Sequence, residues 1–187
     1  VVDGRLDEPA WARATRLTGF SEYRPVDGQK ASDQTEVRVW YSPTALYFGI
    51  IAHDAAPGSV RASVADRDNL DRDDSVRIFL DTFNDHRRAF IFGVNPLGAQ
   101  EDGVQTEGAV NAGRMFGVNG SVDLSPDYQF ESKGVLTPDG YVVEVRIPFK
   151  SLRYPNTDGG RWGVNILRKT QRTGREDTWT DARRTAS

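Results

Sequence analysis

The chain has 187 residues, a length that suits one domain with its own hydrophobic core. Its formal net charge of −3 leaves no basic excess for neutralising phosphates, so no nucleic-acid partner is expected. The absence of Cys excludes disulfides, thiolate metal sites and cysteine nucleophiles. The longest nearly apolar run, residues 46–52, is far shorter than the ~20 residues that cross a bilayer, so we expect no direct membrane insertion.

Helical patterns are scarce along the chain. Residues 7–11 predict a capped single turn, with Pro9 at an early helical position where its missing N–H costs nothing. Residues 149–152 predict a second turn. The segment 101–126 is rich in Gly, Asn and Ser, so we expect a long loop there.

Alternation with a period of two dominates the rest of the sequence. It is clearest in residues 36–41, 46–53, 76–81 and 141–147. Successive side chains of a strand point to opposite faces, so each stretch predicts a strand with one apolar face and one mixed, wet face. Further strands are expected at residues 89–94, 128–136 and 162–168.

Turn-forming residues punctuate these strands. They lie at residues 43–44, 84–85, 95–98, 137–140 and 158–160. Short strands with such spacing predict an all-β fold, a two-sheet antiparallel β-sandwich of jelly-roll-like form with one or two short helical turns. No repeat or linker divides the chain, so residues 1–187 are expected to form a single domain, which we interpret as a fragment of a longer chain.

The order of several motifs resembles that of family-9 carbohydrate-binding modules. The motifs are residues 3–11 (DGRLDEPAW), 35–39 (TEVRV), 45–49 (ALYFG), 73–81 (DDSVRIFLD), 92–98 (FGVNPLG), 140–148 (GYVVEVRIP) and 162–165 (WGVN). The resemblance covers nearly the whole chain. It is strongest to the version at the N-terminus of larger bacterial envelope proteins, where an outer-membrane β-barrel follows. It therefore implies a periplasmic or cell-surface location and a downstream membrane barrel in the same chain.

The resemblance also implies where a sugar would bind. In sugar-binding members two Trp residues clamp a terminal sugar, and polar side chains on neighbouring strands bind its hydroxyls. The first Trp corresponds to Asp71 here, an acidic residue to Arg77 and an Arg to Gly93, while Asn95 is kept. The second Trp would follow residues 179–181, where the sequence ends. Our candidate sugar-binding residues are Trp40, Arg77, Phe79, Asn95 and Trp179.

The Trp residues have alternative interpretations. Trp11 and Trp162 are expected in the core. Trp40 is either an exposed stacking platform or covered by a loop, and Trp179 can play either role.

An acidic stretch, residues 66–74, predicts a calcium site, because Ca²⁺ takes six to eight oxygen ligands. It is not an EF-hand, since the sixth position from Asp66 is Asp71 rather than Gly. The alternative is a solvated loop whose Arg residues offset the acids. The candidate ligands are Asp54, Asp68, Asp71, Asp73 and Asp74.

No catalytic pattern is present. His53 and His86 are the only histidines, and no Gly-x-Ser-x-Gly motif occurs. Two functions remain. One is a non-catalytic carbohydrate-binding module for oligo- or polysaccharides, favoured by exposed aromatics near Trp40, Phe79 and Asn95. The other is a protein-interaction or gating domain of an envelope protein. A flat charged face of Arg38, Arg77, Glu144 and Arg146 would favour this second function.

Overall fold

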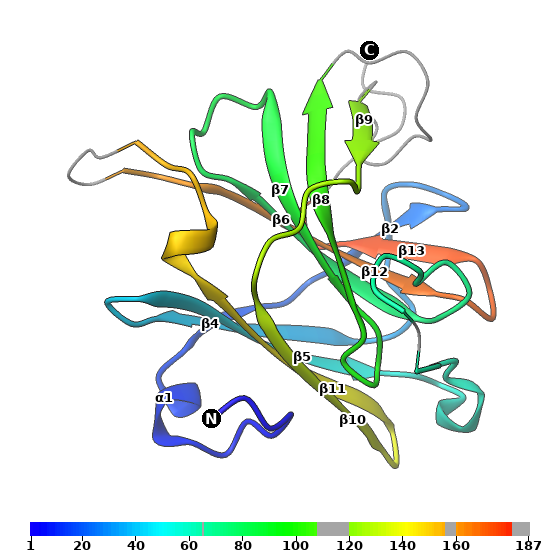
Figure 1. The fold of residues 1–187 in the computed structure, drawn as a ribbon. Helices are drawn as coiled ribbons and strands as arrows, with labels where there is room; N and C mark the ends of the chain where they lie inside the picture. The colour runs from blue at the N-terminus through cyan, green and yellow to red at the C-terminus, as the bar shows by residue number, and fades with distance from the viewer. Residues whose placement is uncertain (65, 108–119, 156–159, 181–187) are drawn as a thin grey trace.

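The computed structural model describes residues 1–64, 66–107, 120–155 and 160–180. Two antiparallel sheets pack face to face, and the few helical elements are single turns (Figure 1). The predicted antiparallel β-sandwich is therefore confirmed. None of the described helices is long and apolar enough to cross a membrane.

The five-stranded sheet carries most of the strands that alternation predicts. Its order is β1 (Thr15–Leu17), β4 (Thr35–Tyr41), β5 (Ala45–His53), β11 (Gly140–Pro148) and β10 (Glu131–Thr137). Strand β5 lies at its centre, where Ile50 is paired with Val37 on one side and Val143 on the other. These three side chains share the inner face and are fully buried.

The eight-stranded sheet contains more strands than the sequence predicts. Its order is β3 (Gln29–Lys30), β2 (Ser21–Arg24), β13 (Arg175–Thr178), β12 (Gly163–Thr170), β6 (Ser75–Asp81), β7 (Arg88–Val94), β8 (Gln100–Glu107) and β9 (Gly120–Asp123). The prediction of a loop over residues 101–126 is wrong at both ends of that segment. Strand β8 pairs with the whole of β7, and β9 pairs with β8. Residues 108–119 of that segment lie outside the described residues.

The outer face of the eight-stranded sheet is not wet at its centre. All seven residues of β6 are buried. Phe79, Ile91 and Leu167 form a second apolar cluster on this side, with Ala89 and Val122 packed against it. The expectation of one wet face on β6 is therefore wrong, because neighbouring strands supply apolar cover that single-strand alternation does not reveal.

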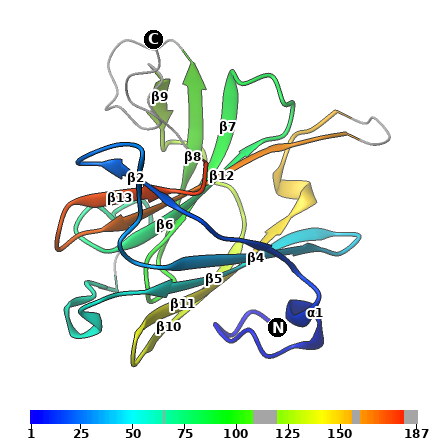
Figure 2. The same cartoon turned by 180° about the vertical axis from the view of Figure 1, so that it is seen from behind.

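The N-terminal segment and α1 (Pro9–Ala12) cover part of the outer face of the five-stranded sheet (Figure 2). Leu6 and Trp11 lie so close to Gly49 that an added Cβ there would sit 2.6 Å from Leu6 Cδ2. The Glu144 carboxylate accepts the backbone N–H groups of Asp3 (2.8 Å) and Gly4 (3.1 Å). The outer face of this sheet is thus covered where Glu144 lies.

Two 3₁₀ turns complete the fold, η1 (Pro57–Ser59) and η2 (Phe149–Ser151). The second confirms the turn predicted at residues 149–152. It follows β11 directly and extends beyond the point where β10 pairs with that strand.

Candidate functional site

The predicted sugar-binding residues of the eight-stranded sheet are occupied by contacts within the protein. Arg77 is 6% exposed and donates to both carboxylate oxygens of Glu101, with Nη2 at 2.9 Å from Oε2. The ion pair of Arg77 and Glu101 lies over Gly93, where an added Cβ would lie 3.0 Å from Glu101 Oε1. Phe79 is 4% exposed within the second apolar cluster. None of these groups presents a free polar atom or ring face.

Asn95 holds a turn together. Its Nδ2 donates to Ser63 O and to Asp73 Oδ2, both at 2.7 Å. Its Oδ1 accepts the N–H groups of Leu97 (3.0 Å) and Ala99 (2.9 Å). Because the side chain is fully buried and bonded at both ends, its observed role is structural.

The two remaining candidates are Trp residues at separate places. Trp179 follows β13, and its ring packs against the main core. Trp40 lies on the outer face of the other sheet, half-buried, with one ring face stacked on Tyr47 at 3.9 Å and 4°. Trp11 meets Trp40 edge-on at 5.9 Å. The five candidates therefore do not line one surface, and their role in sugar binding stays a prediction.

Trp40 begins a row of side chains that crosses the outer face of the five-stranded sheet. In strand register, Trp40 is opposite Tyr47, Tyr47 opposite Arg146, and Arg146 opposite Glu131. Arg146 Nε donates to the Tyr47 hydroxyl at 3.2 Å, and its Nη1 pairs with the Glu131 carboxylate. Stacking and charged hydrogen bonds thus connect four strands in a line that ends at a pocket.

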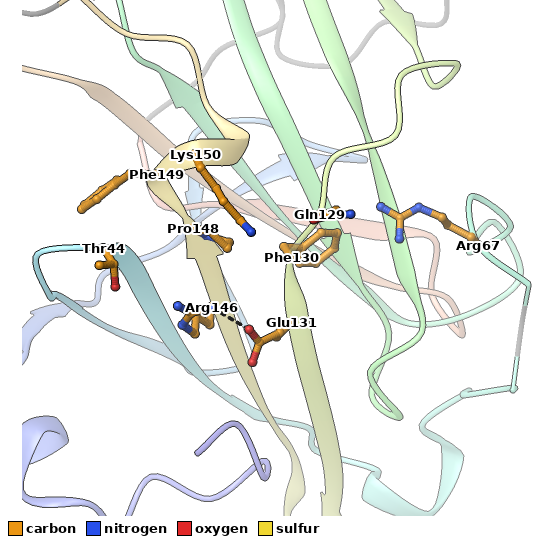
Figure 3. Close-up of a pocket in the computed structure, with 9 residues that line it drawn as sticks. All are labelled: Thr44, Arg67, Gln129, Phe130, Glu131, Arg146, Pro148, Phe149 and Lys150. Atoms are coloured by element: carbon orange, nitrogen blue, oxygen red, sulfur yellow. Dashed lines mark hydrogen bonds and ion pairs between the residues drawn. The ribbon is translucent and has the colours of Figure 1, made fainter.

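The pocket lies in a fork between two arms of the chain. The pairing of β10 with β11 ends at Glu131 and Arg146. One arm of the fork is the segment that leads from β9 of the other sheet to Glu131, and the other arm runs from Arg146 into η2. Strand β11 stays paired with β5 as far as Pro148 and leads into η2, and Ser151 Oγ donates to Gln129 O at 2.6 Å across the fork. This fork pocket has a volume of about 760 Å³ (Figure 3). It is lined by Thr44, Arg67, Gln129, Phe130, Glu131, Arg146, Pro148, Phe149 and Lys150.

The lining combines ring surface with hydrogen-bonding groups. Phe130 and Phe149 supply apolar surface, while Gln129 and Thr44 supply an amide and a hydroxyl. Lys150 reaches from η2 into the space between the arms (Figure 3). Within the described part of the chain, no hydrogen bond or ion pair engages its ammonium group. A pocket of this size, with apolar walls and a few polar groups, is typical of small-ligand sites, which span roughly 300–1,000 Å³.

Sequence reasoning found parts of this pocket but not the pocket itself. It predicted the turn that carries Lys150 and named Arg146 as a member of a charged face. It gave no indication that Arg67 and residues 129–131 would meet them. The polar residues that follow Pro148 at the end of a strand were the available indication of a site. No pattern in the sequence, however, indicates that Arg67 lies near them.

The five predicted calcium ligands are not brought together. Asp73 accepts bonds from Ser63 and Asn95, Asp74 accepts the backbone N–H groups of Arg61 and Gln171, and Asp54 lies near two Arg side chains. Asp71 is exposed. Of the five, only Asp68 lies in a cluster of acids that the described residues form, together with Asp102 and Asp127.

This trio fits calcium poorly. Its carboxylate oxygens lie within 4.8 Å of one another, but three carboxylates supply the six oxygens that Ca²⁺ needs only if each binds through both oxygens. Arg67 already pairs with Asp102 and lies 3.5 Å from Asp127. Burial raises the pKa of Asp102, because desolvation disfavours its charged form. Calcium binding stays a prediction, which melting with and without a chelator would test.

The charged face that would favour an interaction domain is divided. Arg38, Glu144 and Arg146 belong to the five-stranded sheet, while Arg77 lies in the other sheet and is buried. Glu144 is itself beneath the N-terminal segment. These four residues form no flat surface.

The fold defines a two-sheet antiparallel β-sandwich domain. More narrowly, the chain belongs to the carbohydrate family 9 binding domain-like family, whose sequence profile matches residues 2–186. The resemblance on which the sequence interpretation depended is therefore confirmed. Among curated proteins, no sequence matches this chain.

Two solved structures share the fold. Both are family 9 carbohydrate binding modules from Caldicellulosiruptor kristjanssonii, one in complex with glucose and one with cellotriose. The glucose complex has a TM-score of 0.63 and 19% identity, covering 96% of this chain and 80% of that chain. The cellotriose complex has a TM-score of 0.60 and 20% identity, covering 95% and 77%. At such identities the likeness shows the fold alone.

Proposed function

We propose that this domain is a non-catalytic module that binds oligosaccharides in the fork pocket. The family is one of carbohydrate-binding domains, and the two structural neighbours are complexes with glucose and cellotriose. The observation that carries the proposal is the pocket lining. Phe130 and Phe149 line the pocket together with the donors of Gln129, Arg146 and Lys150. Sugars need both kinds of surface, because their C–H faces pack on rings while fixed polar groups bind their hydroxyls.

The pocket suits the proposal better than the positions inherited from the resemblance. The sites at Arg77, Phe79 and Asn95 are closed by internal contacts. At the fork, in contrast, the Glu131 side chain is 56% exposed and the Arg146 side chain 25% exposed, so solvent reaches the pocket. A ligand can therefore enter it without breaking the core.

Calorimetric titration with cellotriose and with a panel of plant and bacterial oligosaccharides tests the proposal. Phe149→Ala removes one ring, and we expect binding to weaken about fivefold, which corresponds to roughly 1 kcal/mol of stacking. Phe83→Ala is the matched control, since Phe83 is 52% exposed in the turn after β6. Circular dichroism should show that both variants keep the fold.

A well-folded protein that binds no saccharide in the panel would contradict the proposal. Binding that Phe149→Ala leaves unchanged would place the sugar elsewhere, and titration of Trp40→Ala would then test the predicted platform. A cell-envelope location and a membrane barrel in the same chain stay predictions from the resemblance. Fractionation of the producing cells would test the location.

A further inference from the structure

We infer that the fork pocket selects saccharides that carry a carboxylate, that is, oligosaccharides containing uronic acid. This inference rests on the proposed function and names the ligand class of the same site. Nothing in the family description or in the ligands of the two structural neighbours assigns it.

The first observation is the charge of the lining. Its ionisable side chains are three cations, Arg67, Arg146 and Lys150, and one anion, Glu131. The whole chain, in contrast, has a net charge of −3. A local excess of cations in an acidic protein concentrates anionic ligands at that place.

The second observation is that the three cations differ in how far they are neutralised. Arg67 pairs with Asp102 and lies 3.5 Å from Asp127, so its charge is compensated from behind the pocket. Arg146 pairs with Glu131. Lys150 has no such partner among the described residues, although its side chain extends into the fork (Figure 3). The uncompensated charge of the pocket is therefore the Lys150 ammonium.

The third observation is that the pocket already holds a carboxylate of its own. Glu131 places its carboxylate on Arg146, and its side chain is 56% exposed. Solvent screens an ion pair with an exposed carboxylate, so Glu131 can turn aside at little cost. A uronate carboxylate then takes its place on Arg146, or binds between Arg146 and Lys150.

The pocket also has room for such a ligand. Its volume of about 760 Å³ lies in the range of sites that enclose ligands larger than a single ring. Gln129 and Thr44 remain available for hydroxyl groups. We therefore expect a short acidic oligosaccharide, with one carboxylate in the fork.

Three ligands of similar size separate the effect of the ligand's charge on affinity from the effect of its shape. These are trigalacturonate, its fully methyl-esterified form and neutral cellotriose, each titrated calorimetrically at low and moderate NaCl. We expect trigalacturonate to bind about tenfold more tightly than its ester, the equivalent of about 1.4 kcal/mol. The preference should shrink as salt is added, because ions screen charges at the pocket rim.

Lys150→Met should abolish the preference, so that trigalacturonate and its ester bind with equal affinity, and Lys150→Arg should restore it. Lys30→Met is the matched control, because Lys30 is exposed on β3 at the far edge of the other sheet and should leave the preference intact. Both Lys side chains are exposed, so both variants should fold.

The outcomes distinguish this inference from the proposed function. Equal binding of trigalacturonate, its ester and cellotriose would overturn the acidic preference and leave saccharide binding intact. A preference that survives in Lys150→Met would overturn the assignment to the fork. No binding of any of the three to folded protein would overturn both ideas.

Discussion

Asp177 on β13 is a carboxylic acid in surroundings that disfavour its charge. It is 1% exposed, and burial raises its pKa to about 6. Arg168 and Arg175 oppose this shift, whereas the charges of Glu22 and Asp33 add to it. In the folded protein Asp177 therefore holds its proton at a pH where the unfolded chain has released it.

This difference predicts how stability depends on pH. Because the pKa of Asp177 is higher in the folded than in the unfolded state, its contribution is fully present below about pH 4 and is lost as the pH rises through about 6. Asp177→Asn removes the titration. We expect the variant to gain on the order of 2 kcal/mol relative to wild type between pH 4 and pH 7.

Urea denaturation across that pH range measures the effect. The control is Asp7→Asn, since Asp7 is exposed before α1. The pH dependence of its stability should match that of wild type. If the free energy of unfolding depended on pH in the same way for wild type and for Asp177→Asn, then Asp177 would not bind its proton as described.

At the residue scale, sequence reasoning identified residue types correctly and surroundings incorrectly. Arg77 and Asn95 were chosen as ligand-binding groups because the resemblance to sugar-binding modules places polar side chains at these two positions. Their partners, Glu101 and Asp73, lie on other segments, and the sequence gives no sign of the pairing. Burial of a polar side chain depends on tertiary contacts, which alternation along one strand cannot report.

Among the elements, the β7–β8 turn and β10 are closely packed against each other. An added Cβ at Gly134 of β10 would lie 2.2 Å from the carbonyl oxygen of Pro96. On the turn side, a Cβ at Gly98 would lie 2.9 Å from the Gly134 nitrogen. Backbone meets backbone here, which connects a turn of the eight-stranded sheet to the edge of the other sheet.

Gly134→Ala should therefore force the turn and β10 apart. We expect it to lower the free energy of unfolding by roughly 1–3 kcal/mol, as overpacking does. Chemical denaturation measures this loss. Gly58→Ala is the control, because nothing lies within 4 Å of a Cβ at that position. Equal stabilities for the two variants would rule out the close contact.

The sequence predicted the long alternating strands well. Strands β4, β5, β6 and β11 were expected nearly at their observed bounds, because alternation over six or more residues is a strong pattern. The short strands β1, β2, β3 and β13 were missed, since two to four residues carry too few alternations. Strand β8 was missed because its polar and Gly residues resemble a loop, although pairing with β7 holds them extended.

For the whole molecule, Arg168 connects the two sheets. It lies on β12 and is 1% exposed, yet its guanidinium reaches strands of the other sheet. It donates to Thr35 Oγ1 at 3.0 Å and to the carbonyl of His53 at 2.6 Å. It also lies over the Tyr141 ring at 5.7 Å. One buried cation thus satisfies hydrogen-bond acceptors on β4 and β5.

Arg168→Met should be strongly destabilising, because it keeps the bulk but leaves those acceptors unpaired. We expect a loss of about 2–4 kcal/mol in the free energy of unfolding. Arg153→Met provides a matched control, since Arg153 is exposed. Thermal and urea denaturation would measure both variants. A loss below about 0.5 kcal/mol for Arg168→Met would contradict its role between the sheets.

The fold class could be predicted from the sequence, but the assignment of strands to sheets could not. Strands β6 and β12 pair although about eighty residues separate them along the chain, and no local pattern encodes that pairing. The fork pocket depends on the same long-range arrangement. It forms only because the chain crosses from β9 to β10 beside η2.

The row from Trp40 to Glu131 gives the pocket an optical reporter. The indole of Trp40 is stacked on Tyr47, whose hydroxyl accepts a bond from Arg146 at the pocket. A ligand that draws Arg146 away changes the electrostatic field at Tyr47 and thereby the emission of the stacked indole. Intrinsic fluorescence should therefore shift on binding in wild type and not in Trp40→Phe. This difference allows occupancy to be followed in unlabelled protein.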